Sequence, residues 1–108
     1  VMIQITIYQD SESRFTGFDS IGHAEYAEEG SDIVCAGVSA LVIATVNSIE
    51  MLTEDRATST ASQETGEIHF RLETFGHDSQ LLFQSMVLGL EEMERNYSEY
   101  IDLIFKEV

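Results

Sequence analysis

The sequence contains no proline and no tryptophan, and only one cysteine in 108 residues. Without proline, neither helices nor strands are interrupted by its fixed φ angle and missing N–H group. A single cysteine cannot form a disulfide within the chain, so nothing in the sequence requires an oxidising compartment. A chain of this length has room for one hydrophobic core, and we expect a single domain over residues 2–108.

Basic side chains are also scarce. Twenty Asp and Glu residues against five Lys and Arg give a formal net charge of −15. Nucleic-acid backbones and anionic membranes are bound by Lys and Arg, so we expect neither as a direct partner. The same charge would attract a basic protein and speed its approach at low salt. A solvated surface with no partner is the simpler interpretation of the charge. The charge therefore argues against nucleic acid more strongly than it argues for any partner.

The sequence lacks a long hydrophobic segment as well. Its main apolar run, Ile33–Val46, is shorter than the roughly 20 residues that span a bilayer, and it suits a helix buried on most sides. The chain opens on an alternating strand pattern, which leaves no place for the basic and apolar regions of a signal peptide. We therefore expect a cytoplasmic protein.

Hydrophobic periodicity predicts five strands and two helices. The first helix has Asp32 as its N-cap and runs to Leu52. The second has Asp78 or Ser79 as its N-cap and runs to Tyr97, with an apolar face at helical spacing. The predicted strands are residues 2–8, 14–23, 56–63, 67–73 and 101–106. The simplest way to bury these faces is an α+β fold of two layers, with both helices on one face of a roughly five-stranded sheet. Neither helix is flanked by a repeated βαβ pattern, so we expect a mixed or mostly antiparallel sheet.

Cys35 lies three residues after Asp32, in the first turn of the apolar helix. Backbone N–H groups there lack intrahelical partners, and the macrodipole adds about half a positive charge. Both features stabilise a thiolate, and the same N–H groups can hold a developing oxyanion. A lone cysteine in an apolar helix is, however, more often a small packing residue. Position alone leaves both interpretations open.

Three histidines are candidate bases for this thiol. His69 projects from the polar face of an alternating strand, which indicates a solvent-facing residue. His77 lies in the turn before the second helix and suits a capping or surface role. His23 ends a predicted strand and is separated from Cys35 only by a short loop and the start of the helix. A strand–loop–helix connection can bring its two ends together, so His23 and Cys35 can meet across the mouth of the loop.

Two further polar residues accompany this pair. Asp32 is either an N-cap or a neighbour that orients the His23 imidazole, and Ser39 lies one turn after Cys35 on the same helical face. The Ser39 hydroxyl either hydrogen-bonds near the site or bonds a backbone carbonyl. The cysteine and histidines show none of the close pairs typical of zinc ligands, and phosphate-binding glycine loops and the GxSxG motif are missing. We expect no metal and no cofactor.

The motifs Gly22-His-Ala24 and Gly30-Ser-Asp-Ile-Val-Cys-Ala-Gly-Val-Ser-Ala-Leu41 closely resemble the ribosomal-processing cysteine protease family, Prp. The likeness covers nearly the whole chain, including Val46-Asn-Ser48 and Gln80-Leu-Leu82. The combination of GHA, a short gap and DIVCA-x-VSAL is specific, whereas either half alone would be weak.

The resemblance implies a bacterial cytoplasmic endopeptidase that removes the N-terminal extension of large-subunit ribosomal protein twenty-seven, cleaving after an aromatic, apolar-rich segment. It implies homodimers and a Cys–His dyad, which maps onto Cys35 and His23, with Asp32 and Ser39 as neighbouring family positions. The loop before the helix resembles a mobile segment that orders around substrate, here with Glu25, Tyr26, Glu28 and Glu29. A ribosomal protein is basic, so the acidic surface would steer it towards the protease.

Two other classes of function are weighed against the protease. A non-catalytic acidic ribosome-assembly adaptor would bind the same basic ribosomal protein, with Cys35 as buried packing that is alkylated only on unfolding. A redox or thiol-transfer protein is disfavoured because the chain contains no resolving cysteine.

Overall fold

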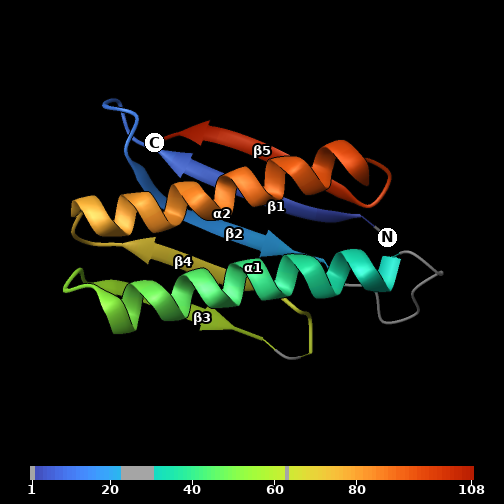
Figure 1. Ribbon diagram of the computed structural model, residues 1–108, viewed down its shortest axis with the longest axis horizontal. Coiled ribbons are helices and arrows are strands. Elements are labelled where there is room, and N and C mark those ends of the chain that lie inside the picture. Colours follow the sequence, from blue (N-terminus) through green and yellow to red (C-terminus); the bar gives the residue numbers. More distant parts are fainter. Residues whose placement is uncertain (1, 23–30, 63) are drawn as a thin grey trace.

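The chain folds into two layers, with two helices side by side over one face of a five-stranded sheet (Figure 1). The computed structural model describes residues 2–22, 31–62 and 64–108, and the side chains of Ser31 and Asp32 lie outside that description. In chain order the elements are β1 (Ile3–Gln9), β2 (Phe15–Ile21), α1 (Ser31–Leu52), β3 (Ala57–Ala61), β4 (Ile68–Leu72), α2 (His77–Asn96) and β5 (Ile101–Glu107). This arrangement confirms the predicted α+β class.

The sheet is mixed, with the strand order β3-β4-β2-β1-β5. The pairs β1–β2, β2–β4 and β3–β4 are antiparallel, whereas β1 and β5 run parallel. β5 lies at an edge, where unpaired backbone groups invite other strands. Glu94 of α2 covers part of this edge, because its carboxylate accepts the Leu103 N–H at 2.6 Å.

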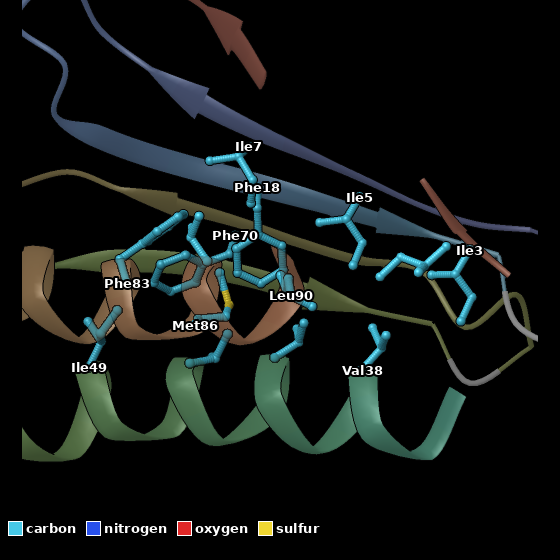
Figure 2. Close-up of a cluster of buried hydrophobic side chains, with 14 of the residues drawn as sticks. Ile3, Ile5, Ile7, Phe18, Val38, Ile49, Phe70, Phe83, Met86 and Leu90 are labelled. Atoms are coloured by element: carbon cyan, nitrogen blue, oxygen red, sulfur yellow. The ribbon is translucent and has the colours of Figure 1, made fainter. Parts of the chain in front are cut away.

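The core lies between the sheet and the helices. The alternation in β1 turns Ile3, Ile5 and Ile7 towards the helices, where each is at most 4% exposed. Phe18 of β2 stacks on Phe70 of β4 with 5.5 Å between ring centroids (Figure 2). The buried positions of α1 recur every three or four residues, as an amphipathic helix requires: Val34, Val38, Val42, Val46 and Ile49.

α1 is longer than the apolar run Ile33–Val46. Its segment Ile33–Leu52 is long and apolar enough to cross a membrane by length and composition alone. In the fold, its inward face is buried on the sheet and it packs along α2, where a Cβ on Gly37 would lie 2.7 Å from the Met93 Cε. The absent side chain therefore lets the two helices approach closely, which is how a core helix packs.

The predicted start of α1 is wrong by two residues. The helix begins at Ser31, so Asp32 is its second residue and not the N-cap that precedes it. Cys35 is consequently the fifth residue of the helix, at the start of its second turn.

The predicted caps of α2 are also wrong. The N-cap is Gly76, with no side-chain cap hydrogen bond, and both Asp78 and Ser79 lie inside the first turn. The physical reason is an acceptor that is distant in sequence, because the Asp55 carboxylate accepts a hydrogen bond from the Gly76 N–H at 2.9 Å. At the other end Tyr97, the predicted last residue of the helix, is the C-cap and is 39% exposed. The buried residues of α2 are Ser79, Phe83, Met86, Val87 and Leu90.

Candidate active site

A cavity of about 260 Å³ lies between the sheet and the N-terminal part of α1. Its lining residues are Ile3, Ser20, Gly22, Cys35, Ala36, Val38, Ser39, Val42, Gly66 and Ile68. The side chains that are at most 5% exposed form its floor: Ile3, Ser20, Val38 and Val42. Figure 2 shows Ile3 of β1 and Val38 of α1 at this end of the core, both extending into the space between sheet and helix. The floor is therefore mostly apolar.

Gly22 brings the end of β2 to this cavity. Its φ is +94°, a left-handed conformation that side chains rarely adopt, and an added Cβ would lie 2.9 Å from the Met2 carbonyl oxygen. Glycine therefore lets the chain turn beside β1 as it leaves the sheet. The next residue is His23, which lies outside the described residues together with the predicted substrate-loop residues Glu25, Tyr26, Glu28 and Glu29.

Cys35 lies half-buried at the wall of the cavity. Helical side chains lean towards the helix N-terminus, which directs the sulfur back over the first turn of α1. The backbone N–H groups of that turn have no intrahelical partners. Ser39, one turn further on, is exposed and lines the same cavity. The predicted neighbourhood of Cys35 and Ser39 is thus present, while the side chain of Asp32 lies outside the description.

His69 lies on the opposite face of the sheet, which the helices do not cover. It neighbours the cavity residue Ile68 in β4, and consecutive strand residues point to opposite faces. Its Nδ1 is 2.7 Å from the Asp19 carboxylate, which also accepts from Tyr8 at 2.6 Å and pairs with Arg71 at 2.9 Å. Burial raises the pKa of Asp19, but the hydrogen bonds from Arg71, Tyr8 and His69 outweigh it and lower this pKa to about 2. The predicted outward orientation of His69 is confirmed, and its partner was not foreseen.

His77 is the first residue of α2, and its exposed ring lies 3.2 Å from the Asp78 carboxylate. It borders a hollow that also includes Leu52, the last residue of α1. At 1.5 Å per residue, that end of α1 is roughly 25 Å from Cys35 along the helix axis. The predicted surface role of His77 is confirmed, and the ring is far from the cavity.

Sequence reasoning missed the cavity residues that come from the strands. Ser20 is one of them, because Gly17 and Gly22 blur the alternation of β2. The signal that could have found it is its position two residues after Phe18, which places both on the helix-facing side. Gly66 and Ile68 reach the cavity from the turn before β4 and from its first residue, and only the strand pairing brings them near β2.

The chemistry that the cavity offers is that of a thiol. Cys35 is the one ionisable side chain among the cavity-lining residues that the structure describes. Over residues 2–22, 31–62 and 64–108, no three His, Cys, Asp or Glu side chains lie close enough together to hold a metal ion. A thiol at the wall of an apolar cavity, over N–H groups that lack intrahelical partners, can act as a nucleophile on a bound carbonyl.

Comparison with known proteins identifies the family. The family model described as cysteine protease Prp matches residues 2–102. The ribosomal processing cysteine protease Prp of Staphylococcus aureus is 37% identical over 106 residues, which cover 97% of this chain and 100% of that protein. Two solved structures of the ribosomal processing protease Prp from S. aureus also match over 97% of this chain and 100% of theirs. One, in complex with a substrate peptide, has a TM-score of 0.91 and 36% identity, and the other, with a covalently linked product peptide, has 0.88 and 37%. This chain therefore belongs to the Prp cysteine protease family and is a cysteine protease.

Proposed function

We propose that this protease removes the N-terminal extension of large-subunit ribosomal protein twenty-seven through a dyad of Cys35 and His23. The observation that carries the proposal is that Cys35 and Gly22, the residue next to His23, line the same cavity. The S. aureus relative is named for ribosomal processing, and one of the matching S. aureus structures holds a covalently linked product peptide. Family membership favours this enzyme over the non-catalytic adaptor.

The placement of the other two histidines supports His23 as the base. His69 is bound to Asp19 on the uncovered face of the sheet, and His77 lies near the far end of α1. A base must come within hydrogen-bond reach of the thiol. His23 follows the cavity residue Gly22, whereas His69, which follows the cavity residue Ile68, points to the other face of the sheet.

The mechanism follows from these positions. The His23 imidazole takes the Cys35 proton, and the sulfur forms a bond to the scissile carbonyl carbon. First-turn N–H groups of α1 stabilise the oxyanion. The imidazolium then gives its proton to the leaving amine as the C–N bond breaks, which leaves a thioester. Water, deprotonated by His23, attacks the thioester, and the carbon–sulfur bond breaks to release the acid and restore the thiol.

The cavity and the charge of the protein both suit such a substrate. An apolar cavity of about 150 Å³ is enough to hold benzene. The cavity of about 260 Å³ beside Cys35 therefore has room for the ring of an aromatic residue from the extension. The net charge of −15 attracts a basic ribosomal protein and raises its association rate at low salt.

We also propose that the protease acts as a homodimer in the cytoplasm. Contiguous exposed apolar patches mark interaction surfaces. Exposed apolar side chains lie on α1, with Ile43 48% and Met51 81% exposed. Sedimentation of the intact protein tests the dimer, which a monomer at micromolar concentration would contradict. Cell fractionation tests the location.

A peptide-cleavage assay tests the dyad. The substrate is a synthetic peptide that spans the extension and its cleavage site. Cys35→Ala and His23→Ala should each lower kcat/KM by about 1,000-fold or more, since nucleophile and base act as one unit. His77→Ala is the matched control and should cleave like the wild type. Near wild-type cleavage by both dyad variants would show the mechanism to be wrong, and binding without cleavage by the wild type would restore the adaptor.

A further inference from the structure

Three polar side chains are buried among the residues that the structure describes, and all three carry hydroxyls that differ in their hydrogen bonding. Ser79 is 0% exposed and donates to the Thr53 Oγ1 at 3.1 Å, and Thr45 is 8% exposed and donates to the Leu41 carbonyl at 2.7 Å. Ser20 is 5% exposed and lines the cavity, and its hydroxyl has no hydrogen-bond partner among residues 2–22, 31–62 and 64–108. Buried hydroxyls are nearly always paired, so this one requires an explanation.

The surroundings of Ser20 give no structural reason for a hydroxyl. It sits in β2 opposite Ile5 of β1 on one side and Ile68 of β4 on the other. Across the cavity lie Val38 and Val42 of α1. An alanine would fit the same position without the cost of burying an unpaired polar group. The hydroxyl therefore lowers stability in the ligand-free protein and is available to a ligand that enters the cavity.

We propose that Ser20 is a specificity-determining residue, whose hydroxyl binds the polar tip of an otherwise apolar substrate side chain. This inference rests on the proposed function, in which the cavity beside Cys35 receives a side chain of the substrate. Tyrosine is the side chain of this chemistry, because its ring suits the apolar walls and its phenol both donates and accepts a hydrogen bond.

Because Ser20 lies deep in the cavity, its hydroxyl can reach a side chain of the substrate but not the substrate backbone. The scissile carbonyl must reach the sulfur of Cys35, which is half-buried at the cavity wall beside the exposed Ser39. Ser20, at 5% exposed, belongs to the floor. A backbone held at the sulfur can reach that floor only through a side chain, and the volume of about 260 Å³ admits an aromatic one.

The size of the expected effect follows from the chemistry of one neutral hydrogen bond. Such a bond contributes a modest net free energy, equivalent to about 3- to 10-fold in affinity. Phenylalanine would leave the Ser20 hydroxyl unpaired, as it is in the ligand-free protein. The cavity should therefore bind tyrosine about 3- to 10-fold more tightly than phenylalanine at the position that enters it.

Binding to the Cys35→Ala protein tests this without turnover. The probes are extension peptides in which each apolar position is made phenylalanine or tyrosine in turn, and calorimetry gives Kd with and without Ser20→Ala. At one position the Tyr/Phe preference should be about 3- to 10-fold, and Ser20→Ala should abolish it. Thr45→Val, which removes a buried hydroxyl away from the cavity lining, should leave the preference intact.

The outcomes separate this inference from the proposed function. An equal Tyr/Phe ratio with and without the Ser20 hydroxyl at every position would overturn the role of Ser20, whether or not the active enzyme cleaves the peptides. A Ser20-dependent ratio in binding, together with no cleavage by the wild type, would support Ser20 and overturn the protease substrate. Absence of binding by every peptide would overturn both.

Discussion

The two ends of α1 differ in how completely the polar side chains around them are hydrogen-bonded. Beyond the C-terminal end, Asp55 accepts from the Thr74 Oγ1 at 2.7 Å and from the Gly76 N–H at 2.9 Å, which ties the loop after α1 to the start of α2. Near the N-terminal end, the buried Ser20 hydroxyl has no partner in the described part of the chain and faces a cavity of about 260 Å³. One end is closed by its own side chains, and the other keeps space and bonding capacity.

The difference indicates a division of work along one helix. The paired end joins the loop after α1 to the start of α2. The cavity end carries Cys35, and it keeps a buried hydroxyl with no partner in the described part of the chain, which costs stability. Binding sites commonly reduce stability in this way, and the loss must be offset elsewhere in the fold. The two ends do not differ in this way if substitutions at the cavity end lower the free energy of unfolding as much as substitutions at the paired end.

The largest expected effect is on stability at the paired end. Asp55→Ala removes a charged acceptor and leaves the Thr74 hydroxyl and the Gly76 N–H without their partner. Hydrogen bonds to charged groups contribute about 1.5–3 kcal/mol each, so we expect a loss of about 3 kcal/mol in the free energy of unfolding, measured by urea titration. Cleavage by the folded variant should persist, because the cavity is remote. A loss under about 0.5 kcal/mol would contradict the structural role of Asp55.

Acid should weaken the paired regions first. Hydrogen bonds from Ser79, Thr74 and the Gly76 N–H lower the pKa of Asp55, and the pKa of Asp19 falls from 3.8 to about 2. Because both pKa values are lowered by folding, the stabilisation is present above the ordinary carboxyl pKa and is lost as the pH falls towards 2. For Asp19 this amounts to about 2 kcal/mol. Urea titrations between pH 5 and pH 2 measure it, and a variant Asp19→Asn with an unchanged acid slope would refute the assignment.

At the cavity end, Gly22→Ala should destabilise the protein and impair cleavage together. The φ of +94° and the Cβ position 2.9 Å from the Met2 carbonyl oxygen predict a cost of about 1–2 kcal/mol, with displacement of the chain that leads to His23. Thermal unfolding and kcat/KM on the extension peptide measure the two effects. Gly22→Asn should recover part of both, since asparagine tolerates left-handed backbone better. Full activity in Gly22→Ala would show that this turn does not position the site.

The smallest effects come from two matched serines and have opposite signs. Ser79→Ala removes a paired buried hydroxyl and should cost about 1 kcal/mol, because the Thr53 Oγ1 loses the bond from Ser79 and keeps only the one from the Asp55 N–H. Ser20→Ala removes an unpaired one and should be neutral or stabilising by up to about 1 kcal/mol. The denaturant midpoints of the two variants, each compared with the wild type, measure these changes in stability. Equal destabilisation by both would mean that the two ends do not differ as described.

The sequence was sufficient for the elements and their order. The alternation in residues 2–8 and 67–73 and the apolar run Ile33–Val46 correspond to β1, β4 and α1, because these patterns arise from each element's own burial. Both helix starts were mistaken. For α2 the reason is that Asp55, 21 residues before Gly76, takes the place of a local cap. Capping rules read local sequence and cannot see such an acceptor.

The site was predictable only where its residues are close in sequence. The motif around Cys35 is local, and Ser39 shares its cavity because both lie on one helical face. The floor of that cavity is not local, since Ile3 and Ser20 come from two strands that only the pairing of the sheet brings together, beneath α1. The partner of His69 was hidden likewise, because Asp19 is 50 residues away in sequence.

The parallel pairing of β1 with β5 has a consequence for synthesis of the chain. Ile3, on the cavity floor, lies in register with Ile101, so the first strand finds this neighbour only after the last strand has been translated. A nascent chain that still lacks β5 leaves one edge of β1 unpaired and the floor incompletely supported. The topology therefore makes full support of the cavity floor depend on translation of β5.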